Sequence, residues 1–311
     1  MENFRTDLAD ERRDLFRKAN HLENEIPGIE AEEVQKSKYI KLNKVRILNE
    51  EGANAIGKPI GNYITFDLKY LNVAGDEEIQ SAAEALSEEL KTLIESKVKK
   101  ADDILIVGLG NEKVTPDSLG PRVISKIDVT RHWFTYMPQL TDENTRPVSA
   151  VSPGVLGTTG IETQEILKGI VENVKPKLIV VIDALASKSM ERISSTIQLA
   201  DTGIVPGAGV GNRRQELSEK TLGIPVIAIG VPTVVEAATV AADSLTIFIK
   251  KLQEEAKSNK FLNELNEENK YEMIKEVLQP NDFNFIVTPK EIDDLILNMS
   301  SVVARGINMS L

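Results

Sequence analysis

The sequence has no cysteine and only two histidines among its 311 residues. Without cysteine the chain cannot form disulfides, thiolate metal sites, iron–sulfur clusters or a cysteine nucleophile, and this composition suits a reducing interior. A serine–histidine pair would need His21 or His132, and neither lies in a glycine-framed loop. The sequence also lacks an H-E-x-x-H motif, so a metal site would have to be built from carboxylates alone, as magnesium or manganese allow.

Basic residues are outnumbered, and no apolar run is long. Lysine and arginine number 37 against 48 aspartates and glutamates, which gives a net charge of −11. A protein that binds nucleic acid without sequence preference needs a basic face, so direct nucleic-acid binding is not expected. The first twenty residues carry charge throughout, and the apolar run at 178–182 is far too short to cross a bilayer. We therefore expect a cytoplasmic protein that has no membrane partner.

Short apolar runs alternate with helical stretches in the middle of the chain. The runs are at 104–107, 178–182 and 226–231, and the helical stretches are near 121–127, 159–174 and 234–252. Thr159 and Glu162 have the spacing of a capping box at the start of the second helix. Continuous β-branched runs between helices are typical of a parallel sheet that is buried on both faces. The sequence predicts an α/β fold with a mostly parallel sheet covered by helices on both faces.

The flanking segments differ from the middle of the chain in composition and pattern. Residues 1 to about 36 are charged and helix-prone, and apolar residues at helical spacing predict a helix over 79–94. We expect an N-terminal β-rich decoration, a core at about 77–255 and a C-terminal helical appendage at about 256–311, within one domain. Further expected elements are a strand pair within 39–67 broken at 51–61, a helix at 263–278, a strand at 283–287 and a last helix from Thr288.

Two aspartates follow apolar runs and are the candidate site residues. Asp117 comes after the run at 104–107, and Asp183 comes directly after the run at 178–182. The carboxyl ends of parallel strands share one edge of a sheet, where ligands bind, so both carboxylates are expected at that edge. Two close carboxylates can share a proton and serve as base and acid toward an attacking water. Helix and turn caps are the more common use of such residues, and spacing alone favours that structural role.

The glycine-rich segments do not complete a phosphate-binding motif. In the loop after 104–107, Gly108 and Gly110 are followed by Lys113 where the dinucleotide fingerprint needs its third glycine. The glycine-dense segment 207–212 is better explained as a tight turn or a loop close to substrate. The sequence has no Walker A lysine motif and no G-x-S-x-G elbow. We expect no nucleotide cofactor.

Several long motifs resemble one known family. They are RTDLADE at 5–11, GLGNEKVTPDSLGPRV at 108–123, PGVLGTTGIET at 153–163, KPKLIVVIDALA at 175–186, TIQLADTGIVPGAGVGNRR at 196–214, TLGIPVIAIGVPTVVEAATVAAD at 221–243 and FIVTPKEIDDLI at 285–296. In this order they resemble the germination proteases of spore-forming Gram-positive bacteria, over nearly the whole chain. The core segments also look more distantly like hydrogenase maturation endopeptidases.

The resemblance implies an endopeptidase that degrades small acid-soluble spore proteins in the spore core during germination. It implies that Asp117 and Asp183 are the catalytic pair, the same carboxylates that the sheet-edge argument isolates. The distant relatives add a histidine that binds metal, whereas this chain has no histidine after His132, so a metal-free site without cofactor is expected. The family is also expected to assemble as homotetramers.

The resemblance further implies a zymogen that removes its own N-terminal segment. Family members cleave between an acidic residue and a large apolar residue that is followed by alanine, and Asp7-Leu8-Ala9 fits that pattern. We therefore expect cleavage between Asp7 and Leu8, with residues 1–7 as the propeptide and 8–311 as the protease domain. The structural alternative is that Thr6 is the N-cap of a helix.

Two other functions stay open on the sequence. Asp117 and Asp183 could instead be the ligands of a metal-assisted hydrolase, which a chelator would inhibit. The chain could also be a non-catalytic module whose sheet edge binds an extended peptide, and such a module would tolerate Asp117→Asn. A nucleotide-binding role ranks last because both glycine loops lack the full fingerprint.

Overall fold

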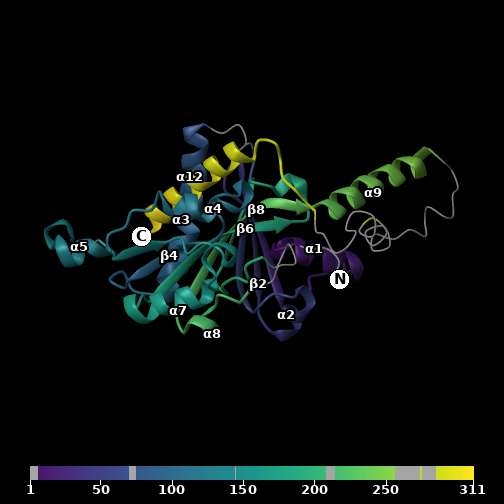
Figure 1. The fold of residues 1–311 in the computed structure, drawn as a ribbon. Coiled ribbons are helices and arrows are strands. Elements are labelled where there is room, and N and C mark those ends of the chain that lie inside the picture. The colour runs from purple at the N-terminus through teal and green to yellow at the C-terminus, as the bar shows by residue number, and fades with distance from the viewer. Residues whose placement is uncertain (1–5, 70–74, 144, 208–213, 256–273, 275–284) are drawn as a thin grey trace.

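The computed structural model describes residues 6–69, 75–143, 145–207, 214–255, 274 and 285–311. The described elements form a single mixed sheet with helices on both faces (Figure 1). In the described part of the chain, no helix is long and apolar enough to cross a membrane.

The sheet has a parallel half and an antiparallel half. Its strand order is β1-β2-β3-β7-β8-β6-β4-β5, and β9 pairs with β8 outside this path. The parallel strands are β4 (Ile104–Gly108), β5 (Val148–Val151), β6 (Leu178–Ser187) and β8 (Val226–Glu236). The antiparallel strands are β1 (Ile29–Gln35), β2 (Ile40–Ile47), β3 (Gly61–Leu68), β7 (Thr196–Ala200) and β9 (Ile286–Val287).

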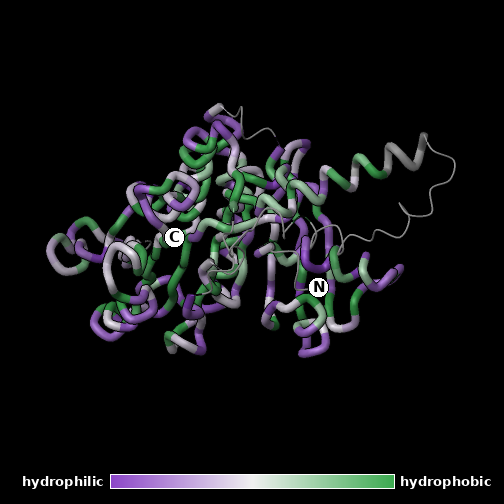
Figure 2. The backbone as a smooth tube through the Cα atoms, turned by 45° about the vertical axis from the view of Figure 1, so that its right-hand side comes forward, coloured by the Kyte–Doolittle hydropathy of each residue, from purple (hydrophilic) through white to green (hydrophobic). Residues whose placement is uncertain are grey.

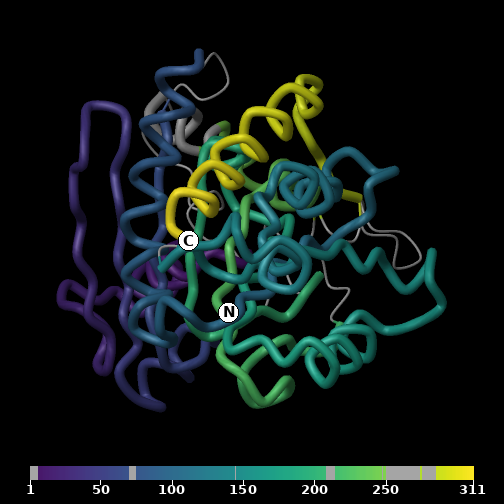
Figure 3. The backbone as a smooth tube through the Cα atoms, turned by 90° about the vertical axis from the view of Figure 1, so that its left-hand side faces the viewer, coloured from purple at the N-terminus to yellow at the C-terminus, as the bar shows by residue number. Residues whose placement is uncertain are grey.

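One face of the sheet is covered continuously by helices. Helices α3 (Asp76–Lys97), α4 (Leu119–Ile124) and α12 (Ile292–Ser310) cover it, and α12 packs along α3 (Figures 1 and 3). Their apolar side chains join alternate residues of the strands in the largest core cluster, which includes Phe66, Leu86 and Ile182. Figure 2 shows the strands at the middle of the molecule as hydrophobic segments, which agrees with this burial.

The other face is covered by two separate groups of helices. Helices α1 (Ala9–Ala19) and α2 (Glu50–Ile56) pack on the antiparallel half, around Tyr63 and Ala228. Helices α7 (Thr163–Val174) and α8 (Glu219–Leu222) belong to the cluster on the parallel half, around Leu105 and Val181. Between the two groups runs a seam over β8 and the end of β6, and the candidate site lies there.

Two helices extend beyond these layers. Helix α9 (Ala237–Glu255) continues directly from β8 and points away from the body, and the short helix α5 (Arg131–Tyr136) projects on the opposite side (Figure 1). The remaining short elements are α6 (Leu156–Thr159) and the 3-10 turns η2 (Thr115–Asp117), η3 (Pro138–Leu140) and η4 (Met190–Arg192).

The predicted α/β class and the helices on both faces are confirmed. The N-terminal β-rich segment joins the central sheet, because β3 pairs with β7. Residues 29–35 form strand β1, because they pair along their whole length with β2. The expected break at 51–61 contains helix α2, which begins at the N-cap Asn49, whose side chain accepts from the Gly52 N–H.

Several predicted element boundaries are wrong. The N-cap of α7 is Glu162 and its first residue is Thr163, so Thr159 ends the preceding turn α6 and no capping box joins Thr159 to Glu162. The last helix starts at Ile292, because the Thr288 hydroxyl donates to the carbonyl of Thr233 on β8 and so does not cap it. The strand expected at 283–287 is present as the short β9, and the helix expected at 263–278 falls outside the described residues except for 274.

Candidate functional site

A row of three residues crosses the seam on the open face of the sheet. Asp183 on β6 pairs with Gly230 on β8, and Gly230 pairs with Gln198 on β7. Their neighbours Ile182 and Ile229 lie in the core of the opposite face, so all three point toward the seam because side chains alternate along a strand. Gly230 has no side chain, and the Leu185 side chain lies above it, since a Cβ on Gly230 would be only 2.2 Å from Leu185 Cδ1.

Asp183 lies inside strand β6 rather than after it. The sequence predicted that the strand ends at Ile182, but β6 continues to Ser187 because it pairs with β8 across a bulge between Leu185 and Ala186. Asp183 is 5% exposed; its Oδ1 accepts the Ala184 N–H at 3.0 Å, and among the described residues its Oδ2 has no hydrogen-bond partner. This geometry does not cap a turn.

The pKa of Asp183 is raised well above its usual value. Burial is the main cause, and the nearby carboxylates of Asp117 and Asp7 raise the pKa further. The Ala184 N–H and the charge of Arg214 oppose this rise without cancelling it. The structure therefore favours a protonated Asp183 over a wider range of pH than an exposed aspartate would have.

Asp117 ends the short turn η2 in the loop that follows β4. Its Oδ2 accepts the Asn111 N–H at 2.8 Å, and the N-cap of α4 is Ser118, so Asp117 does not cap that helix. Burial raises the pKa of this half-buried carboxyl, while the Asn111 N–H and Arg214 lower it. The pKa of Asp117 is thus raised by burial but not, like that of Asp183, by other carboxylates.

Gly110 allows the Asp117 loop to lie against the end of β4. Its φ is +113°, and a Cβ at this position would lie 2.0 Å from the Asp117 carbonyl oxygen and 3.1 Å from Oδ1. A side chain here would push the turn that carries the carboxylate away from the sheet. Gly110, which belongs to the incomplete dinucleotide motif of the sequence, thus positions Asp117.

Asp117 and Asp183 line one cavity of about 290 Å³. The structure thus brings together the two carboxylates that the sequence singles out. Arg214 also lines this cavity, and its Nη1 is buried without a hydrogen-bond partner among the described residues. Gly207 lies at the same cavity, whereas residues 208–213 of the glycine-dense segment lie outside the described residues.

The N-terminal segment of the chain enters this cavity. Asp7 is a lining residue; its N–H donates to the Ala186 carbonyl at 2.9 Å, and its Oδ2 accepts the Ala186 N–H at 3.0 Å. Leu8 is fully buried, and helix α1 begins at Ala9 with Leu8 as N-cap residue. Thr6 is therefore not the N-cap; its hydroxyl bonds Glu11 and accepts the Leu8 N–H.

Gln198 holds the backbone on both sides of Leu8. Its Oε1 accepts the Ala9 N–H at 2.7 Å, and its Nε2 donates to the Asp7 carbonyl at 3.3 Å. The same side chain amide thus bonds the carbonyl of the Asp7–Leu8 peptide bond and the N–H of the Leu8–Ala9 peptide bond. The bond that the sequence predicts to be cleaved is held in a fixed position one strand away from Gly230.

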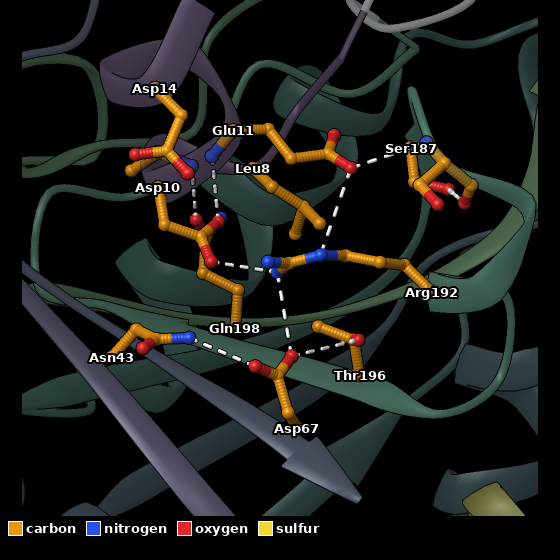
Figure 4. A network of polar contacts seen from close by, with 12 residues as sticks. Leu8, Asp10, Glu11, Asp14, Asn43, Asp67, Ser187, Arg192, Thr196 and Gln198 are labelled. Carbon is orange, nitrogen blue, oxygen red and sulfur yellow. Dashed lines mark hydrogen bonds and ion pairs between the residues drawn. The ribbon is translucent and has the colours of Figure 1, made fainter. Parts of the chain in front are cut away.

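Arg192 fixes the first turn of α1 to the sheet (Figure 4). Its Nη1 lies 2.7 Å from Asp10 Oδ2 and 3.5 Å from Asp67 Oδ1, and its Nε lies 3.8 Å from Glu11 Oε1. Burial raises the pKa of both Asp10 and Glu11, and Arg192 opposes that rise. These ion pairs hold the start of α1, so the segment before it stays at the cavity.

The sequence reasoning missed Arg214 and Gln198 as site residues. Gln198 is a polar residue at the centre of the apolar strand TIQLA, which is a signal for a buried functional side chain. Arg214 follows the glycine-dense segment, and nothing in its spacing distinguishes it from Arg213. In the described part of the chain, no group of three or more histidine, aspartate or glutamate side chains has the geometry to hold a metal ion.

Comparisons with known proteins give a consistent result. The chain matches the family described as "Germination protease" over residues 6–264 and 260–311. It is 49% identical to the germination protease of Caldanaerobacter subterraneus subsp. tengcongensis, over 99% of this chain and 94% of the relative. It is 48% identical to that of Clostridium perfringens strain ATCC 13124, over 100% and 96%, and 41% identical to that of Geobacillus sp. strain WCH70, over 88% and 82%.

Among solved structures, a NiFe hydrogenase maturation protease, HycI from Thermococcus kodakarensis KOD1, is similar to part of the chain. The two are 19% identical, with a TM-score of 0.30, over 47% of this chain and 80% of that one.

Proposed function

The chain belongs to the germination protease family, and on that premise we propose that it is an endopeptidase that cleaves small acid-soluble spore proteins in the spore core during germination. The observation that carries the proposal is the cavity in which Asp117 and Asp183 meet a peptide segment of the chain itself. Membership of a peptidase family and a pair of carboxylates at a cavity that holds a peptide segment support the same reaction.

The different environments of the two aspartates suggest their roles. Asp183 is more buried than Asp117, and its pKa is raised by burial and by two nearby carboxylates. We therefore assign it the proton and the role of general acid. Asp117 is half-buried and accepts a backbone N–H, so we assign it the ionised form and the role of general base. The pair resembles the two-carboxylate arrangement of pepsin-like proteases in chemistry, on an unrelated fold.

The proposed reaction moves two protons. Asp117 takes a proton from a water molecule as that water attacks the scissile carbonyl carbon, while Asp183 gives its proton to the carbonyl oxygen. The tetrahedral intermediate then collapses: one of its hydroxyls returns a proton to Asp183 as the C–N bond breaks, and the amine leaves with the proton that Asp117 accepted. Arg214 lies at the same cavity, where its charge stabilises the negative charge that develops on the reacting oxygen.

We also propose that the chain is made as a zymogen and cleaves itself between Asp7 and Leu8. Asp7 occupies the cavity, and Gln198 holds the Asp7–Leu8 bond in place, so Asp7 obstructs the site until the propeptide is removed. This position explains how so short a segment can block the enzyme. A variant with Asp7→Ala that still shortens at the same bond would contradict this part of the proposal.

The assembly and the location follow from family membership alone. We propose a homotetramer, which sedimentation of the purified chain would test. We also propose that the protein is made in the developing spore, because its substrates would be there.

The experiment that tests the function is a digestion followed by mass spectrometry. The purified chain, after removal of residues 1–7, is mixed with a small acid-soluble spore protein at neutral pH, with and without a chelator of divalent cations. We expect cleavage after an acidic residue, with the same rate in both conditions. Absence of cleavage would contradict the peptidase, and loss of cleavage only with chelator would favour the metal-assisted alternative.

A further inference from the structure

A second cavity lies beside the first on the open face of the sheet. It measures about 260 Å³, and Asp7 and Leu185 line both cavities, so these two residues form the boundary between them. Its charged lining residues other than Asp7 are Arg12, Lys58 and Glu216. With Asp7 the lining has two cations and two anions, and when Asp7 is removed two cations and one anion remain, a net positive charge in a protein whose net charge is −11.

Lys58 is the cation of this cavity without a fixed partner. It follows Gly57, the left-handed C-cap of helix α2, and its Nζ lies 6.0 Å from the centre of the Tyr63 ring. Burial lowers the pKa of Lys58 to about 8, the charge of Arg12 lowers it further, and the carboxylate of Asp7 opposes both. No described residue forms a hydrogen bond or an ion pair with its ammonium group, so this group can accept a ligand.

Arg12 differs from Lys58 because its guanidinium already has backbone partners. It donates to the carbonyls of Thr6 at 2.9 Å, Ile56 at 3.3 Å and Gly57 at 3.0 Å. Arg12 therefore holds the walls of the cavity together. The charge available to a bound side chain comes from Lys58.

The segment around Asp7 shows how a peptide lies across the two cavities. The backbone of residue 7 bonds Ala186 and Gln198, and these contacts use groups that every peptide carries. The Ala186 N–H also bonds the side chain oxygen of Asp7, and an asparagine oxygen can accept the same bond. A positive charge near the carboxylate favours aspartate over asparagine, and Lys58, whose pKa the Asp7 carboxylate raises, supplies such a charge.

We propose that this second cavity, which we name the Lys58 cavity, binds the acidic side chain of the substrate residue that precedes the cleaved bond, and that Lys58 determines this preference. The inference rests on the proposed function, because it assigns a part of the substrate to the same site. In this arrangement Ala186 and Gln198 set the register of the peptide, and Lys58 selects its side chain. Removal of residues 1–7 takes Asp7 out of the boundary and leaves the Lys58 cavity open to substrate.

The test compares two peptides that differ in one charge. Both have the sequence of residues 2–13, one with the natural Asp7 and one with asparagine there, and both are offered at pH 7 to the chain from which residues 1–7 have been removed. We expect kcat/KM to be about tenfold higher for the aspartate peptide, which corresponds to one partly exposed charge pair. Lys58→Met should reduce the ratio to about 1 by slowing the aspartate peptide alone.

Two further variants make the test specific. Lys91→Met on the exposed face of α3 removes the same charge far from the lining residues and should keep the tenfold ratio. Lys58→Glu should invert the preference in favour of a peptide with lysine at that position. A ratio that stays near tenfold in Lys58→Met would overturn the inference.

A second measurement does not depend on cleavage. In the Asp183→Asn background, which keeps the N-terminal segment attached, Asp7→Asn and Lys58→Met are combined in a double-mutant cycle of unfolding by denaturant. We expect the effect of Asp7→Asn to disappear when Lys58 is absent. Full additivity would overturn the carboxylate site. If the wild-type chain cuts neither peptide while this cycle shows coupling, the proposed function fails and the carboxylate site stands.

Discussion

Gly110 offers a test of how the fold positions a catalytic carboxylate without touching the carboxylate itself. A Cβ on Gly110 would lie 2.0 Å from the Asp117 carbonyl oxygen, whereas real Cβ atoms stay at least 3.0 Å from their neighbours. The backbone of Asp117 must therefore move by about 1 Å in Gly110→Ala, because a backbone atom cannot rotate away. A displacement of this size in a reacting group can lower kcat/KM about a hundredfold.

The same substitution also changes stability. At Gly110, φ is +113°, a conformation that costs an alanine about 1–3 kcal/mol, and the clash adds to that cost. We expect the free energy of unfolding to fall by about 2–4 kcal/mol. Peptide cleavage and unfolding by denaturant measure the two effects on one preparation.

Gly169 provides the matched control in the same chain. It lies inside helix α7, and a Cβ there would meet nothing within 4 Å, so Gly169→Ala should raise stability by about 0.5–1 kcal/mol and leave cleavage unchanged. A Gly110→Ala variant with wild-type kcat/KM would refute the idea that this glycine positions Asp117.

Three further predictions concern the charges around the site. Burial raises the folded pKa of Asp183, so the folded state loses stability as pH rises through that pKa. Asp183→Asn should therefore be more stable than wild type by about 1–3 kcal/mol at pH 7 and by less near pH 4, as measured by denaturant unfolding. Arg214→Gln removes a charge that lowers the pKa of both aspartates, so the acidic limb of the pH profile of kcat/KM should move to higher pH, while an unmoved limb would contradict this role. Arg192→Gln leaves Asp10 and Glu11 buried without their cation and should lower stability by about 2–3 kcal/mol at pH 7. The loss should be smaller at pH 4, because the raised pKa values favour the protonated forms as pH falls; an equal loss at both values would argue against the ion pairs.

The sequence predicts that Asp117 and Asp183 lie at one edge of the sheet, because the pattern that indicates this is local. The apolar runs identify the strands, and the aspartates after them fall on the same edge by topology alone. The end of β6 could not be predicted, because Asp183 lies within the strand only through its pairing with Gly230 on β8. That pairing depends on residues almost fifty positions apart, which no local pattern encodes.

The N-terminal part shows a similar limit. The charged composition of residues 29–35 favours helix or coil, yet they form an edge strand because β2 offers its backbone to pair with. The position of Asp7 at the boundary between two cavities and that of Lys58 in one of them follow from the packing of α1 and α2 on the sheet. Sequence reasoning reached Asp7 through a resemblance and did not reach Lys58.

The central claim is that Asp117 and Asp183 act as one catalytic unit. The most direct measurement is kcat/KM for peptide cleavage by Asp117→Asn, Asp183→Asn and the variant that carries both changes. If the pair shares the reaction, each single change should lower kcat/KM by about a thousandfold or more, and the double change should lower it no further. Losses that multiply in the double variant, or near-full activity in either single variant, would contradict the claim.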